Sequence, residues 1–162
     1  MSNAPMTLEE ARGYLARAVL TKGPDFTYRP DASEYTDQED NPCSYFCRTD
    51  LPEDDPRHGT PCLIGVALRL AGREITQDME GEVPDQSNMR KAWNLSERAG
   101  SYFREAQAVQ DNYRTWGEAY RAAEALVVEW EKEDRLAQEP FTVLTIPPEM
   151  ADVSRAEDLS GS

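Results

Sequence analysis

Residues 60–72 read TPCLIGVALRLAG, and this stretch decides the fold expected for the chain. Thr60 is a favourable N-cap, Pro61 is tolerated in a first helical turn, and the closing glycine is typical of a C-cap. The pattern predicts a helix over residues 61–71 that is apolar on most sides. We therefore expect this helix in the centre of the core, with Gly65 admitting a close neighbour.

Three more stretches have apolar residues at helical spacing behind a capping pattern. They are residues 8–22, 95–110 and 116–136, which follow the pairs Thr7/Glu10, Asn94/Glu97 and Thr115/Glu118. Only a short turn separates the last two helices. We therefore expect them to fold back on each other as an antiparallel helical hairpin.

Three short segments have the aromatic or β-branched composition of strands. They are residues 26–28, 43–47 and 141–146, with polar loops expected over residues 30–42 and 50–59. The sequence therefore predicts an α+β fold, in which a small antiparallel sheet packs on the central helix and on the C-terminal helical hairpin.

The predicted domain organisation is a single acidic α+β domain over residues 1–148, followed by a disordered acidic tail over residues 149–162. No stretch is long and apolar enough for a membrane span, and the first residues lack the basic-then-apolar order of a signal peptide. We therefore expect a cytoplasmic protein. In that reducing compartment its three cysteines would be thiols or metal ligands.

The 162-residue chain carries a net charge of −14, and this charge is unevenly distributed. Residues 31–60 hold nine acidic and two basic side chains, and residues 121–162 hold ten and four. Negative charge opposes binding to nucleic acid or to an anionic membrane, and it favours a protein partner with a basic surface. The candidate partner-binding residues are Asp37, Glu39, Asp40, Glu53, Asp54, Asp55, Glu131, Glu133 and Asp134.

Every cysteine and the single histidine fall within twenty residues, as Cys43, Cys47, His58 and Cys62. Three thiolates and one imidazole form a known ligand set for structural zinc. Against zinc, two cysteines four apart in a strand are separated by about 13 Å. A cysteine in the first turn of a helix, with a histidine four residues earlier, also leaves open a thiol nucleophile. No cofactor is otherwise expected, and zinc remains the alternative.

Two segments, residues 60–72 and residues 95–123, resemble an uncharacterised family of small proteins of actinobacterial phages and prophages. The family motifs are P-x-C-L-I-G-x-x-L, which occurs in the first segment with Pro61 and Cys62 adjacent, and A-Q-x-x-Q-D followed by W-G-x-A, which occurs in the second. The chain departs from the family at Ala67, where a histidine is often found. The resemblance implies a phage-type accessory gene product and supplies no activity, cofactor or catalytic residue.

The motifs also point to one cluster near the turn of the helical hairpin, formed by Gln107, Gln110, Asp111 and Trp116. An alternative is that Asp111 and Trp116 only cap and staple the two helices. The sequence as a whole favours a non-enzymatic protein that binds and modulates a host or phage protein. In a sharper version the acidic surface imitates DNA, with carboxylates in place of phosphates. The alternative function is a zinc-stabilised or thiol-dependent protein.

Overall fold

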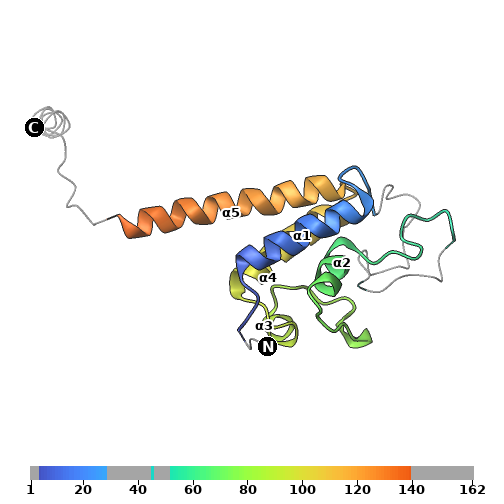
Figure 1. The fold of residues 1–162 in the computed structure, drawn as a ribbon, viewed down its shortest axis with the longest axis horizontal. Coiled ribbons are helices and arrows are strands. Elements are labelled where there is room, and N and C mark those ends of the chain that lie inside the picture. Colours follow the sequence, from blue (N-terminus) through green and yellow to red (C-terminus); the bar gives the residue numbers. More distant parts are fainter. Residues whose placement is uncertain (1–3, 29–44, 46–51, 140–162) are drawn as a thin grey trace, which may run out of the picture. The chain divides into compact units, whose positions relative to one another are not determined.

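The computed structural model of the chain describes residues 4–28, Tyr45 and residues 52–139 (Figure 1). The chain divides into two compact units, Met1–Val128 and Glu129–Ser162. The helices are α1 (Leu8–Lys22), α2 (Leu63–Leu70), α3 (Ser87–Ala92), α4 (Glu97–Asp111) and α5 (Trp116–Gln138), with one turn of 3-10 helix at Gln77–Met79. The predicted boundary between residues 148 and 149 lies outside the described residues.

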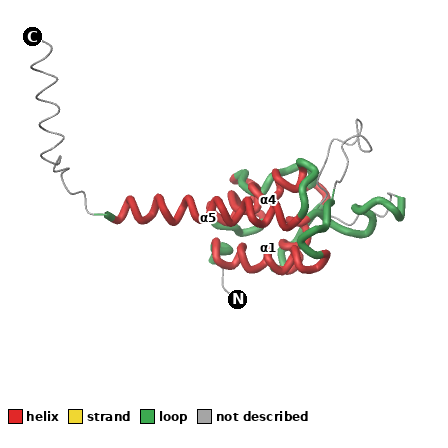
Figure 2. Tube along the Cα trace, turned by 90° about the horizontal axis from the view of Figure 1, so that it is seen from above, coloured by secondary structure: helices red, strands yellow, loops and turns green. Residues whose placement is uncertain are grey.

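The core of the first unit forms where α1, α2 and α4 meet (Figure 1), and Figure 2 shows α1 beside α4. Helix α1 packs against both α2 and α4, and α2 also packs against α4. The largest side chains that are fully buried in this unit are Trp93, Trp116, Tyr28, Tyr45, Tyr102 and Phe103. As expected from its apolar composition, α2 is buried along most of its length.

The predicted α+β class is wrong, because the part of the chain that the structure describes is helical and contains no sheet. Two isolated bridges stand in place of strand pairing there, Met6 with Leu95 and Thr27 with Thr115. The segment at residues 26–28, predicted as a strand, forms no sheet in the described part of the chain. Phe26, together with the turn before it, covers the start of α5 instead of pairing with another strand.

The start of α5 shows why residues 24–28 need no strand partner. The backbone amides of Trp116 and Gly117 donate to the carbonyl oxygens of Phe26 and Pro24, both at 2.8 Å. These amides belong to the first turn of α5, which has no partners for them within the helix. The Phe26 and Trp116 rings also meet edge to face, with centroids 4.8 Å apart. The other predicted strands, apart from Tyr45, lie outside the described residues.

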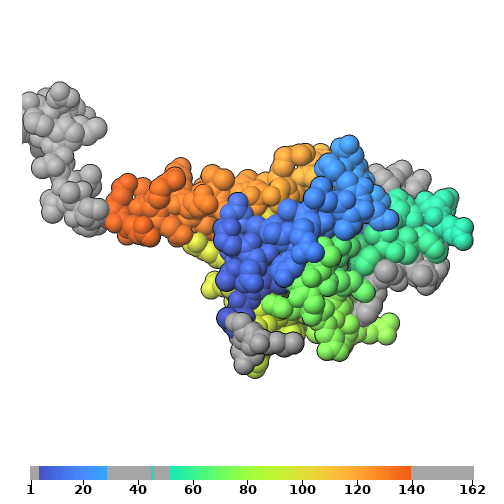
Figure 3. Space-filling model, in the orientation of Figure 1, coloured from blue at the N-terminus to red at the C-terminus, as the bar shows by residue number. Residues whose placement is uncertain are grey.

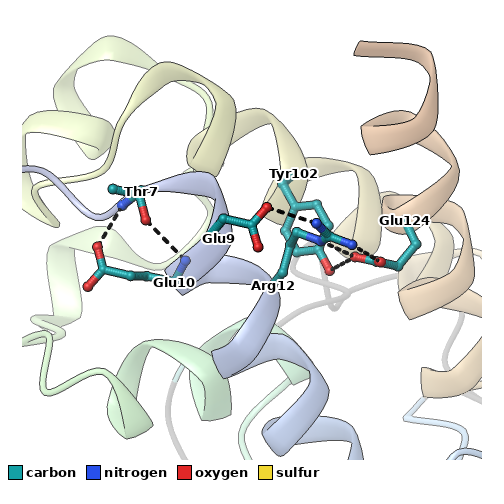
Figure 4. A network of polar contacts seen from close by, with 6 residues as sticks. All are labelled: Thr7, Glu9, Glu10, Arg12, Tyr102 and Glu124. Atoms are coloured by element: carbon teal, nitrogen blue, oxygen red, sulfur yellow. Dashed lines mark hydrogen bonds and ion pairs between the residues drawn. The ribbon is translucent and has the colours of Figure 1, made fainter. Parts of the chain in front are cut away.

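The predicted first helix is confirmed, together with its capping box at Thr7. The Glu10 amide donates to Thr7 Oγ1 at 3.1 Å, and the Thr7 amide donates to Glu10 Oε1 at 3.0 Å (Figure 4). These hydrogen bonds lower the pKa of Glu10, and the largest contribution comes from the Thr7 backbone amide. The side-chain pattern T-x-x-E was therefore sufficient to place this helix start.

Two helix starts differ from the prediction because a different residue provides the cap. Helix α2 begins at Leu63, and its N-cap is Cys62, whose Sγ accepts a hydrogen bond from the Gly65 amide at 3.4 Å. Helix α4 begins at Glu97 with Ser96 as its N-cap. Asn94 was predicted to cap α4 but has a φ of 52°, a left-handed conformation that turns the chain into the helix.

The glycine predicted to admit a close neighbour does so. A Cβ atom at Gly65 would lie 2.8 Å from the carbonyl oxygen of Tyr45 and 3.0 Å from its Cα. The backbone at Tyr45 therefore rests directly on the first turn of α2. This contact brings Tyr45, from the predicted strand at residues 43–47, into the core.

Candidate functional site

The carboxamide of Gln110, which is fully buried, links three helices of the first unit. Its Oε1 accepts hydrogen bonds from the Leu63 amide at 2.7 Å and from Trp116 Nε1 at 3.1 Å. Its Nε2 donates to Asp111 Oδ1 at 3.0 Å. The Leu63 amide is one of the first-turn donors of α2 that have no partner within the helix. Gln110 thus caps α2 and fixes the Trp116 indole at the start of α5.

Gln107 lies one turn earlier on α4 and is also buried. Its Nε2 donates to the Tyr45 hydroxyl at 3.1 Å, and that hydroxyl donates to the carbonyl oxygen of Glu82 at 2.5 Å. Burial raises the pKa of Tyr45, so the hydroxyl keeps its proton and remains a donor. Gln107 Oε1 is buried and accepts no hydrogen bond within the described part of the chain.

The residues predicted to cluster at the hairpin turn therefore fall into two neighbouring groups. Gln110, Asp111 and Trp116 are joined by direct hydrogen bonds. Gln107 is directed instead toward Tyr45. The contacts show that both glutamines hold elements of the core together, which explains why polar residues occupy buried positions of α4.

A second polar network joins α1, α4 and α5 through the Glu124 carboxylate (Figure 4). Arg12 donates to both Glu124 oxygens, from Nε at 3.0 Å and from Nη2 at 2.8 Å. The Tyr102 hydroxyl donates to Glu124 Oε2 at 2.8 Å. Arg12 Nη1 also binds Glu9 Oε1 at 2.9 Å. The sequence did not predict this network, and its only indication was that Glu124 adjoins the apolar stripe of its helix.

The protonation states of this second network follow from its contacts. Hydrogen bonds from Arg12, and then from Tyr102, lower the pKa of Glu124 against the opposing effect of its partial burial. The hydrogen bonds to Glu124 raise the pKa of Arg12. Burial, and then the bond to Glu124, raise the pKa of Tyr102. At neutral pH the network is therefore an ion pair between Arg12 and Glu124 with a neutral tyrosine as third member.

The candidate metal ligands are only partly placed by the structure. Cys62 is disulfide-bonded, in contrast to the expected thiol, and its side chain is fully buried. Cys43 and Cys47 lie outside the described residues. Within residues 4–28, Tyr45 and 52–139, no group of three histidine, cysteine, aspartate or glutamate side chains is arranged to hold a metal ion. His58 lies in the turn before α2, where its amide donates to the Asp55 carbonyl oxygen at 2.9 Å.

The candidate partner-binding acids differ in their exposure. Asp55 forms a nearly buried ion pair with Arg57, in which the side chains are 7% and 3% exposed and Nη2 lies 3.0 Å from Oδ2. Its charge is thus balanced inside the protein. Glu53 and Asp54, next to this pair, are exposed.

In the second unit, Glu131 and Glu133 are exposed on α5, whereas Asp134 is half-buried. The remaining candidates, Asp37, Glu39 and Asp40, lie outside the described residues.

A further acidic segment, not predicted from the sequence, lies at residues 74–85, which form part of the surface near α1 (Figure 3). It contains no lysine or arginine, and its acids are Glu74, Asp78, Glu80, Glu82 and Asp85. Counting charge over larger blocks concealed it, because neighbouring arginines balance the total. Tyr45 anchors this segment, since its amide donates to Glu80 Oε1 at 2.9 Å and its hydroxyl to the Glu82 carbonyl oxygen.

Comparison with protein-family models, with curated proteins and with solved structures finds no match to this chain. Among the described residues, no helix combines the length and the apolar composition that crossing a lipid bilayer requires.

Proposed function

We propose that this protein acts by binding a basic surface of another protein, without itself catalysing a reaction. The observation that carries the proposal is an acidic surface segment that the core holds in place, residues 74–85. Glu74 and Asp78 are exposed there, and Asp85 is exposed beside Arg104, whose Nε lies 3.9 Å from Asp85 Oδ1. Tyr45 binds the Glu80 carboxylate and the Glu82 carbonyl oxygen. Because the backbone is anchored, the exposed carboxylates lose little conformational entropy on binding, which favours affinity.

The exposed end of α5 supports the same proposal from the second unit. Over residues 129–139, Glu129, Glu131, Glu133 and Glu139 are exposed, against Lys132 and Arg135. Acidic side chains in a protein of net charge −14 attract a cationic partner over about 8–10 Å at physiological salt. We therefore expect association to be fast at low salt and to weaken as salt is added.

The class of partner follows from the resemblance to phage proteins. A phage-type accessory protein of the cytoplasm would bind and modulate a host or phage protein. In the sharper form of the proposal, that protein normally binds nucleic acid, and the carboxylates of the acidic surface occupy the positions of phosphates in its basic groove. The negative charge of the protein opposes direct binding to nucleic acid, which carries the same sign of charge.

The alternative of a zinc-stabilised or thiol-dependent protein is weakened by the state of Cys62. Zinc binding and nucleophilic attack both require a thiolate. Cys62 is disulfide-bonded, so its sulfur serves neither role while the bond is intact. This alternative therefore requires the reduced protein.

The proposal is tested by affinity capture from an actinobacterial lysate with three matched double variants of the full chain. Glu74→Gln/Asp78→Asn and Glu129→Gln/Glu133→Gln each remove two charges from one acidic surface. Asp25→Asn/Glu105→Gln removes two charges elsewhere and is the control. We expect a protein captured by the wild type to be lost with at least one acidic-surface variant, retained by the control and eluted by about 0.5 M salt.

Competition with duplex DNA distinguishes a partner that binds nucleic acid from another protein with a basic surface. If the partner is a nucleic-acid-binding protein, duplex DNA added to the lysate displaces it, whereas any other basic partner is retained. Capture of the same proteins by the wild type and all three variants, or by none of them, would overturn the proposal.

A further inference from the structure

Two arginines border the end of the acidic segment, where α3 meets α4. The side-chain stem of Arg90 on α3 packs against Gly100 of α4, where a Cβ atom would lie 2.8 Å from Arg90 Cγ. Arg90 Nε donates to the carbonyl oxygen of Asp85 at 3.2 Å. Arg104 lies one turn after Gly100 on α4, and its Nε is 3.9 Å from Asp85 Oδ1. Asp85 therefore has a guanidinium group on α3 and another on α4 as neighbours.

A second acid, Glu82, lies near Arg104. The Glu82 carbonyl oxygen accepts the hydrogen bond of the Tyr45 hydroxyl. Burial raises the pKa of that hydroxyl, and the charge of Arg104 acts on it in the opposite direction, so Arg104 is close to it. Glu82 and Arg90 are half-buried, and the side chains of Asp85 and Arg104 are 43% and 40% exposed. We call these four residues the mixed-charge patch, in which acids and bases are equal in number.

The charges of the mixed-charge patch are only partly paired within the chain. The Arg104–Asp85 distance is too long for a hydrogen bond, and an ion pair of this exposure contributes little to stability. Among the described residues, the Arg90 guanidinium donates only from Nε, and that of Arg104 donates no hydrogen bond. Their other N–H groups can bind carboxylates in the two-pronged arrangement that guanidinium groups favour.

We propose that the mixed-charge patch is the contact between two copies of this chain in a two-fold symmetric dimer. In such a dimer the same surface faces itself, so a surface with acids and bases side by side is complementary to its own copy. Arg90 and Arg104 of one copy then face Glu82 and Asp85 of the second copy.

A second copy fits this patch better than a partner of one charge does. The two arginines repel a uniformly basic surface, and the two acids repel a uniformly acidic one. A protein of net charge −14 repels its own copies over most of its surface, and a patch of balanced charge is where they approach at the least cost. The inference goes beyond the proposed binding of a basic protein and does not depend on it.

The test is sedimentation equilibrium of the purified full chain at about 0.15 M salt, where repulsion between distant charges is screened. Because a small polar contact forms a weak complex, we expect the average mass to rise toward that of a dimer as the concentration reaches about 0.5 mM. Glu82→Lys/Asp85→Lys makes the patch wholly positive, and Arg90→Glu/Arg104→Glu makes it wholly negative. Each variant should dimerise at least about tenfold more weakly, since like charges then face each other. An equimolar mixture of the two should restore the dimer.

The controls reverse equal numbers of charges at exposed positions outside the patch, in Glu129→Lys/Glu133→Lys and Arg17→Glu/Arg121→Glu. They change the net charge by the same amounts and should leave dimerisation within about threefold of the wild type. If Arg90→Glu impairs folding, because the Arg90 stem packs on Gly100, Arg104→Glu alone replaces the double variant. A wild type that stays monomeric would overturn the proposal, as would equal losses in patch and control variants or a mixture that remains monomeric.

Discussion

The two polar networks of the first unit both join helices through side-chain hydrogen bonds, one with neutral groups and the other with charged groups. The carboxamides of Gln107 and Gln110 are neutral and buried, and they join α4 to Tyr45, α2 and α5. The Arg12–Glu124 network joins α1, α4 and α5 by an ion pair whose side chains are 28% and 25% exposed. Neutral amides suit a dry site because a buried charge carries a large desolvation cost, whereas a partly hydrated site tolerates an ion pair.

The two networks contribute to stability under different conditions. Loss of a buried amide leaves donors without partners in the core, a cost that changes little with pH or salt. Loss of the ion pair removes an interaction that water and salt already screen. We therefore expect removal of a buried amide to destabilise the protein more than removal of a charge from the ion pair.

The largest effect is expected for Gln110→Leu. This change leaves the Leu63 amide and Trp116 Nε1 without their acceptor, and each buried donor costs about 1–3 kcal/mol. We expect the free energy of unfolding to fall by about 3 kcal/mol, measured by urea denaturation. Gln138→Leu, at an exposed position of α5, is the matched control and should change it by less than about 0.5 kcal/mol. Equal losses in the two variants would show that the buried amide is not the cause.

Gln107→Leu should cost less, about 1 kcal/mol, because it removes one hydrogen bond, to the Tyr45 hydroxyl. The buried Oε1 of Gln107, which lacks a donor among the described residues, is removed at the same time, and this offsets part of the loss. The free energy of unfolding of this variant is measured by urea denaturation and compared with that of Gln110→Leu. A loss equal to or larger than that of Gln110→Leu would reverse the ranking and contradict our view of the two glutamines.

Glu124→Gln tests the ion pair through its pH dependence. The pKa of Glu124 is lowered in the folded state, so its contribution is present above the unfolded value of about 4.3 and is lost as pH falls through the lower folded value. We expect the variant to be less stable than the wild type by about 1 kcal/mol at pH 7, and the difference to shrink as the pH falls below the unfolded pKa of about 4.3. Urea denaturation across this range measures the difference, with Glu105→Gln as control.

The smallest effect is expected for Glu9→Gln. The Glu9 side chain is 78% exposed and contacts only one nitrogen of Arg12, whose other nitrogens bind Glu124. Removing its charge should cost no more than about 0.3 kcal/mol, and added salt should abolish the difference. A cost comparable with that of Glu124→Gln would mean that the network acts as a unit across both carboxylates.

The exposure and pairing of the acidic side chains could be predicted only in part from the sequence. The block-wise charge count predicted acidic surfaces and included Glu131 and Glu133, which are exposed. It also included Asp55, whose charge is balanced by Arg57 two residues later, and it overlooked residues 74–85. Burial and pairing depend on which segments meet in space. A charge count along the chain cannot separate a surface carboxylate from a paired one.

Local patterns in the sequence determined the elements that depend on neighbours in the chain. Thr7 and Glu10 placed the start of α1, apolar composition placed α2 in the core, and Gly65 marked a close contact. The tertiary structure alone decided that residues 26–28 cover the start of α5 instead of forming a strand, and that Gln110 caps α2 from α4. Both outcomes depend on backbone amides at helix starts that need acceptors, and residues far away in the sequence provide those acceptors.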